Sequence, residues 1–138
     1  PLRVAMAHLV QNPSLALQAP DLSVFDGCDL PGIEILLELV DFCAKNPNMT
    51  TAQVLELWHD HPAQSYLDTM ATWQFPGGEE LLAQEFRDAV ARLELQWLES
   101  RKNRLPRIVE QTPEQKEEYR MLDQRIAELK SRSGETES

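Results

Sequence analysis

The sequence has few cysteines, no long apolar run and no leader pattern. Two cysteines, Cys28 and Cys43, are too few for a disulfide framework or a four-ligand zinc site, so we expect both to be reduced and packed. No uncharged stretch approaches the roughly 18 apolar residues that a membrane-spanning helix needs. The first residue is Pro1 rather than Met, and no signal peptide follows it. These features predict a piece of a larger cytoplasmic protein that has no contact with a membrane.

Basic residues are also scarce, especially in the first part of the chain. The sequence has 13 Lys and Arg residues against 23 Asp and Glu residues, a net charge of -10. Residues 1–78 contain only Arg3 and Lys45 against nine acidic residues, whereas residues 79–138 are densely charged with mixed sign. Nucleic-acid binding relies on clustered basic groups that neutralise phosphates. We therefore expect little or no direct binding of nucleic acid.

Motifs of catalysis, metal binding and phosphate binding are missing. His59 and His61 are two residues apart, which places them on different sides of a helix, so they are not a metal site by themselves. Pro76-Gly77-Gly78 lacks the Lys-Ser/Thr that follows a phosphate loop and instead predicts the end of a helix. The acidic residues show no recognisable catalytic pairing. The sequence predicts no catalytic residue, no metal and no cofactor.

The apolar residues recur every three or four positions, which is typical of helices, and no stretch alternates as a strand would. We therefore predict an all-α fold. Capping boxes at Thr50…Gln53 and Thr112…Gln115 mark two helix starts, and Pro106 ends or kinks the longest helix. The expected helices cover 2–11, 13–17, 33–45, 51–58, 62–73, 79–105 and 113–130.

The distribution of apolar residues predicts two folded parts. Residues 1–98 have enough apolar side chains for a multi-helix bundle, and the long helix joins this bundle to a two-helix hairpin over 99–130. The hairpin has few apolar residues, so we expect it to be mobile or to complete its core on a partner. Residues 131–138, SRSGETES, are predicted to be a disordered polar tail.

The last helix is the best candidate for a protein interface. Met121 and Arg125 lie beside its thin apolar line, and flexible, aromatic and Arg side chains are typical of protein interfaces. The alternative is that the line only packs this helix onto Leu105, Ile108 and Val109; both can hold in one hairpin. A competing hypothesis is a nucleic-acid-binding domain that uses the basic cluster Arg101–Arg107. The apolar line consists of Tyr119, Leu122, Ile126 and Leu129.

The order of motifs resembles one known family. The segments PLRVAMAHLVQNPSLA, LPGIEILLELVDFC and TTAQVLELW, followed by a tryptophan, a long charged helix and a capped last helix, resemble the C-terminal helicase-binding domain of bacterial DNA primase (DnaG), in its gammaproteobacterial form. The resemblance covers residues 1 to about 130. It implies an N-terminal helical bundle and a C-terminal hairpin, and the zinc-binding and polymerase regions of primase are absent from the sequence.

The resemblance also implies partners. Such domains dock on the N-terminal collar of the hexameric replicative helicase DnaB, mainly through the hairpin, and they modulate the helicase. They also contact the acidic C-terminal tail of single-stranded DNA-binding protein near the first helix, where Arg3 and Met6 are the candidates here. Together with the apolar pattern, the resemblance predicts helicase contacts at Ile108, Tyr119, Met121, Leu122, Arg125, Ile126 and Leu129.

Overall fold

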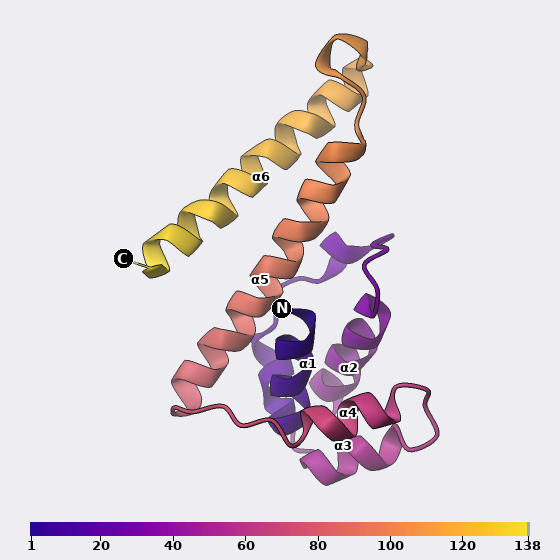
Figure 1. The fold of residues 1–138 in the computed structure, drawn as a ribbon, viewed down its shortest axis with the longest axis vertical. Helices are drawn as coiled ribbons and strands as arrows, with labels where there is room; N and C mark the ends of the chain where they lie inside the picture. The colour runs from indigo at the N-terminus through magenta and orange to yellow at the C-terminus, as the bar shows by residue number, and fades with distance from the viewer. Residues whose placement is uncertain (138) are drawn as a thin grey trace. The chain divides into compact units, whose positions relative to one another are not determined.

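The computed structural model describes the backbone of residues 1–137 and the side chains of residues 1–132. Every regular element in that part of the chain is helical, which confirms the all-α class (Figure 1). The chain divides into two compact units, Pro1–Arg92 and Leu93–Ser138. The boundary between them lies inside the long helix, earlier than the expected boundary between residues 98 and 99.

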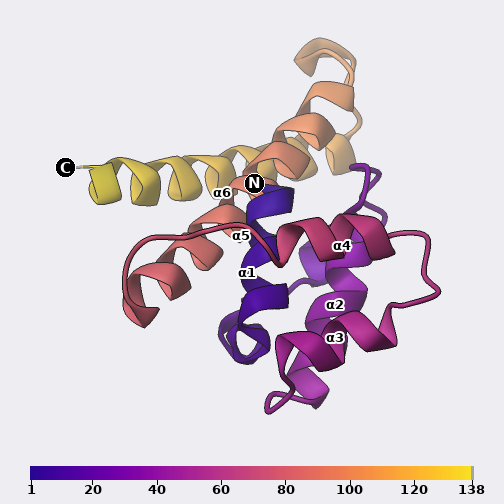
Figure 2. The same cartoon turned by 60° about the horizontal axis from the view of Figure 1, so that its bottom comes forward.

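The first unit is a bundle with α1 at its centre. Helix α1 contacts η1, α2, α3 and α4 (Figure 2). The second expected helix is a short 3₁₀ helix, η1, and the fifth ends at Met70 rather than Trp73. The elements of this unit are α1 (Leu2–Gln11), η1 (Pro13–Gln18), η2 (Ser23–Phe25), α2 (Ile33–Lys45), α3 (Thr51–Leu57), α4 (Gln64–Met70) and the first part of α5 (Glu79–Arg104).

The core of the first unit is mostly apolar, with the ring of His8 also buried. Helix α2 shows why the sequence folds in this way: Leu36, Leu39 and Cys43 recur at helical spacing, so all three fall on one buried face. Burial raises the pKa of the Cys43 thiol to about 11, which keeps it uncharged at neutral pH. The largest fully buried side chains of this unit are Met6, Leu9, Phe25, Ile33, Leu36, Leu39, Leu67, Met70 and Phe86.

Both predicted capping boxes are present. The Gln53 N–H donates to Thr50 Oγ1 (3.2 Å), and the Thr50 N–H donates to Gln53 Oε1 (2.9 Å). The second box repeats these distances, with the Gln115 N–H donating to Thr112 Oγ1 and the Thr112 N–H donating to Gln115 Oε1. Each box satisfies backbone donors that the first turn of a helix leaves free, and this fixes where α3 and α6 begin.

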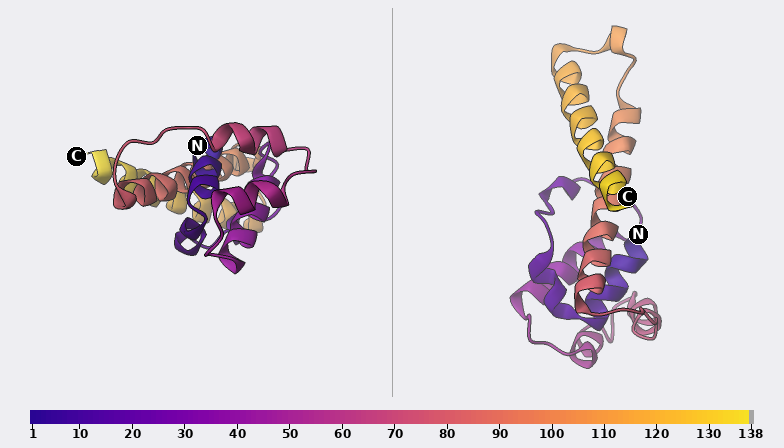
Figure 3. Two further views of the ribbon diagram at one scale, coloured as in Figure 1. Left: turned by 90° about the horizontal axis from the view of Figure 1, so that it is seen from below. Right: turned by 90° about the vertical axis from the view of Figure 1, so that its left-hand side faces the viewer.

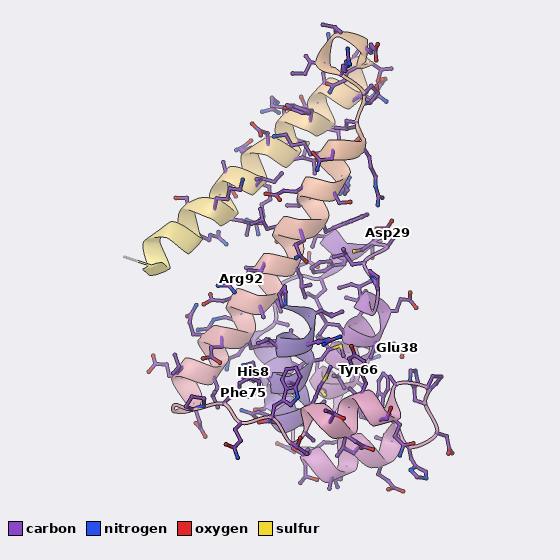
Figure 4. The ribbon with its side chains drawn as sticks, in the orientation of Figure 1. His8, Asp29, Glu38, Tyr66, Phe75 and Arg92 are labelled. Carbon is purple, nitrogen blue, oxygen red and sulfur yellow. The ribbon has the colours of Figure 1, made fainter. Side chains whose placement is uncertain are left out.

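The segment between α4 and α5 is tied to α1 by two polar side chains. Gln11 Nε2 donates to the carbonyls of Met70 (3.0 Å) and Trp73 (2.7 Å), which accept at the end of α4. The His8 ring stacks on Phe75, with 3.9 Å between ring centroids (Figure 4). His8 Nε2 lies 3.2 Å from Glu85 Oε2, and burial lowers the pKa of His8 despite the opposing effect of that carboxylate.

The second unit is the hairpin formed by the end of α5, the 3₁₀ turn η3 (Ile108–Glu110) and α6 (Pro113–Glu137), seen from two sides in Figures 1 and 3. Helix α6 does not end near Lys130 as expected but continues to Glu137. The polar segment contains no proline, and a single glycine weakens a helix by about 1 kcal/mol without stopping it. The predicted disordered polar tail starts at Ser131, so the part of it up to Glu137 lies on helical backbone. Ser138 and the side chains of residues 133–138 lie outside the described residues.

Candidate functional site

Within the described residues, four ion pairs cross between the two helices of the hairpin. Each joins a residue of α5 to a residue of α6, and these helices run antiparallel on either side of the turn (Figure 1). The pairs lie mostly at the surface, where each contributes about 0–1 kcal/mol. They are Glu94–Arg125 (2.9 Å), Glu99–Lys130 (3.3 Å), Arg101–Glu118 (3.0 Å) and Lys102–Asp123 (2.6 Å).

The pair between Glu94 and Arg125 differs from the other three because it is bidentate and largely desolvated. Arg125 Nε donates to Glu94 Oε2 and Arg125 Nη2 donates to Glu94 Oε1, both at 2.9 Å. The Glu94 side chain is 12% exposed and the Arg125 side chain 37% exposed. The hydrogen bond to Glu94 is the main cause that raises the pKa of Arg125. This geometry fixes the register of α6 on α5.

The buried apolar side chains of the hairpin form a seam between the same helices. Leu122, Ile126 and Leu129 of α6 are 5–6% exposed. The expected seam partners Ile108 and Val109 are instead at the surface, because the chain leaves the helix at Pro106 and they lie in the turn. Helix α5 also has buried residues in this unit, namely Leu93, Trp97 and Leu98.

The predicted contact residues therefore separate into two groups. Ile108 and Met121 are each 59% exposed and remain available to a partner. Tyr119 is half-buried, with Lys102 Nζ 5.0 Å from its ring centroid. Leu122, Ile126 and Leu129 belong to the seam, and Arg125 binds Glu94 instead of projecting from the exposed flank.

The basic cluster Arg101–Arg107 is partly occupied within the hairpin. Arg101 and Lys102 bind Glu118 and Asp123, and the hydrogen bond to Asp123 is the main cause that raises the pKa of Lys102. The Arg101 and Arg104 guanidinium groups each lie 5.8 Å from the centroid of the Trp97 ring. These contacts reduce the positive charge that the cluster presents to a phosphate backbone.

The two candidates in α1 have different positions. Met6 is 2% exposed and lies in the core, so its side chain cannot provide the surface contact expected of it. Arg3 is exposed, and its guanidinium carbon lies 5.4 Å from the centroid of the Tyr66 ring. Tyr66 itself is 46% exposed. An exposed cation beside an exposed aromatic ring can contact an acidic peptide.

The histidine cluster has local structural partners. His61 Nδ1 accepts a hydrogen bond from the Ala63 N–H (3.0 Å), and His59 Nδ1 lies 3.2 Å from Gln64 Nε2. Across the described residues there is no group of three or more His, Cys, Asp or Glu side chains that could hold a metal ion. None of the helices in this part of the chain is long and apolar enough to cross a membrane.

Comparison with known families decides between the hypotheses. The family model described as "DNA primase DnaG DnaB-binding" matches residues 2–122. The chain belongs to this family of DnaB-binding domains of DNA primase. The match is to the non-catalytic interaction domain of primase rather than to its catalytic part, and it confirms the resemblance seen in the sequence.

Individual relatives support this family. The DNA primases of Pasteurella multocida and Escherichia coli K12 are each 32% identical, over 72% and 75% of this DnaB-binding domain. The chain spans only 17% and 18% of the length of these two relatives. A crystal structure of the DnaG primase C-terminal domain from Vibrio cholerae is similar to this structure, with a TM-score of 0.71 and 32% sequence identity. The match covers 88% of this chain and 95% of the Vibrio cholerae chain.

Proposed function

We propose that this DnaB-binding domain docks primase on the N-terminal collar of the hexameric helicase through its hairpin. Docking would recruit primase to the cytoplasmic replication fork for RNA primer synthesis and would modulate the helicase. The single observation that carries this proposal is the family match over residues 2–122, which includes the turn and the first part of α6.

The surface of the hairpin supports the proposal. Of the seven large apolar side chains that are exposed in the described residues, Ile108, Val109 and Met121 lie in the hairpin, although it is the smaller unit. Single exposed apolar residues are common, but a concentration of them on a small element is typical of binding surfaces. Met121 adds a flexible side chain that adapts to a partner.

The direct test is a titration of the domain with the purified helicase hexamer, beside a titration with single-stranded DNA at low and moderate salt. We expect helicase binding and no DNA binding near 0.15 M salt. Met121→Ala should weaken helicase binding by about 1–2 kcal/mol. Leu57→Ala is the matched control, because Leu57 is also 59% exposed but lies on α3. Salt-resistant DNA binding without helicase binding would favour the alternative function.

We propose a second contact, with the acidic tail of single-stranded DNA-binding protein, at Arg3 and Tyr66. The exposed Arg3 guanidinium beside the Tyr66 ring supports it, because a carboxylate and an apolar side chain of one peptide could use both groups. Arg3→Ala should reduce binding of a synthetic tail peptide at least fivefold. Arg92→Ala, which removes an exposed arginine of α5, should not.

A further inference from the structure

The turn between α5 and α6 presents two adjacent apolar side chains. Ile108 is 59% exposed and Val109 90% exposed, and no other large apolar side chain in the described residues is as exposed as Val109. Both lie in η3, the 3₁₀ helix at the tip of the hairpin. The stability of the fold gains almost nothing from a side chain that is nine-tenths exposed, so both side chains are available to a partner.

The backbone of this turn is held in place from within. Gln111 is 8% exposed, and its Nε2 donates to the Pro106 carbonyl (2.9 Å), which closes the base of the turn. The Glu110 N–H donates to the Arg107 carbonyl (2.8 Å), and the Gln111 N–H donates to the Ile108 carbonyl (3.3 Å). The capping box of Thr112 follows directly. A turn fixed in this way loses little conformational entropy on binding.

The turn carries charges of both signs beside its apolar pair. Arg107 is exposed, directly precedes Ile108, and forms no ion pair with any described residue. Glu110 is also exposed and directly follows Val109. A partner surface that complements this tip has an apolar centre and a carboxylate on the side of Arg107.

A phosphate backbone fits the tip less well, because it would contact Arg107 but would leave Ile108 and Val109 without an apolar surface. A symmetric contact between the tips of two copies would bring Arg107 and Glu110 of both copies to one interface, and the experiment below distinguishes it by the dimers that it would form.

We infer that this tip, rather than the flank of α6, is the main anchor of the hairpin, and that it inserts Ile108 and Val109 into an apolar pocket on the helicase collar. Arg107 then pairs with a carboxylate at the edge of that pocket. This inference rests on the proposed function and specifies which part of the hairpin carries it and what surface receives it.

The test compares three variants of the domain in titrations with the purified helicase hexamer. The double variant Ile108→Ser with Val109→Ser should weaken binding at least 30-fold. Arg107→Glu should weaken it about tenfold at 50 mM salt and less at 300 mM, because salt screens exposed charges. Leu57→Ser, an equally exposed site on α3, should stay within twofold of the unchanged domain. Circular dichroism checks that each variant keeps its helix content.

A photoreactive phenylalanine in place of Val109 gives an independent measurement, and it should crosslink to the N-terminal collar of the helicase. If the unchanged domain binds but the double variant binds equally well, the tip is not the anchor and the proposed function stands. If the unchanged domain does not bind, both fail. Dimers of the domain that disappear in the double variant, or DNA binding that disappears in Arg107→Glu, would also overturn the inference.

Discussion

Replacing Arg125 by alanine should destabilise the hairpin, although the sequence alone predicts an exposed contact residue at this position. The change removes both hydrogen bonds to Glu94, whose side chain is 12% exposed and forms no other ion pair with the described residues of α6. Removing one partner of a fully buried pair costs about 3–5 kcal/mol, whereas surface pairs contribute about 0–1 kcal/mol. Because Arg125 is itself 37% exposed, we expect an intermediate cost of about 2 kcal/mol.

Hydrogen exchange of the α6 amides measures this cost as a change in the free energy of local opening. Arg120→Ala is the matched control, because Arg120 is 65% exposed and binds Glu117 within the same helix. It should leave the free energy of local opening nearly unchanged, because solvent screens an exposed pair. In a Glu94→Gln background the effect of Arg125→Ala should fall to about 1 kcal/mol, since a neutral amide needs less compensation than a carboxylate. An equal effect of Arg125→Ala and Arg120→Ala would refute the reasoning.

Three further predictions concern stability. Burial lowers the pKa of His8, so between pH 6.5 and that lower pKa the unfolded chain binds a proton that the folded chain does not. The free energy of unfolding should therefore fall as the pH drops through this window, and His8→Gln should flatten this dependence in urea titrations. Leu36→Ala should cost about 2–5 kcal/mol in the same titrations, because Leu36 is completely buried and the change leaves a cavity. Thr112→Ala should cost about 1 kcal/mol and should speed hydrogen exchange at the start of α6. Thr69→Ala should leave that exchange unchanged, because the Thr69 hydroxyl lies in α4 and donates to the Ser65 carbonyl.

Local sequence signals predicted the helices well. The capping boxes at Thr50 and Thr112 depend on residues three positions apart. Proline is excluded from helix interiors because it lacks a backbone N–H. Leu36 and Cys43 fall on the buried face because helical periodicity is a property of the sequence itself. The all-α class and the boundaries of α1, α2 and α5 followed from such signals.

Contacts between distant residues were not predictable in the same way. The pairing of Glu94 with Arg125 depends on the register between two helices, which the geometry of the intervening turn determines. Met6 and Arg3 are only three residues apart in α1, yet one is in the core and the other at the surface. A thin apolar line such as Leu122, Ile126 and Leu129 has the same sequence pattern whether it forms a seam or an interface. The structure assigns it to the seam.

The hydrogen bond from Gln111 to the Pro106 carbonyl holds the shape of the tip without using the side chains that the tip exposes. Substitutions at Ile108 and Val109 change what the tip presents without changing how the turn folds. These two positions can therefore diverge between lineages together with the pocket of the cognate helicase, while Gln111 is constrained by folding. Primases from distant bacteria would then share the architecture of the hairpin and yet fail to substitute for one another at the fork.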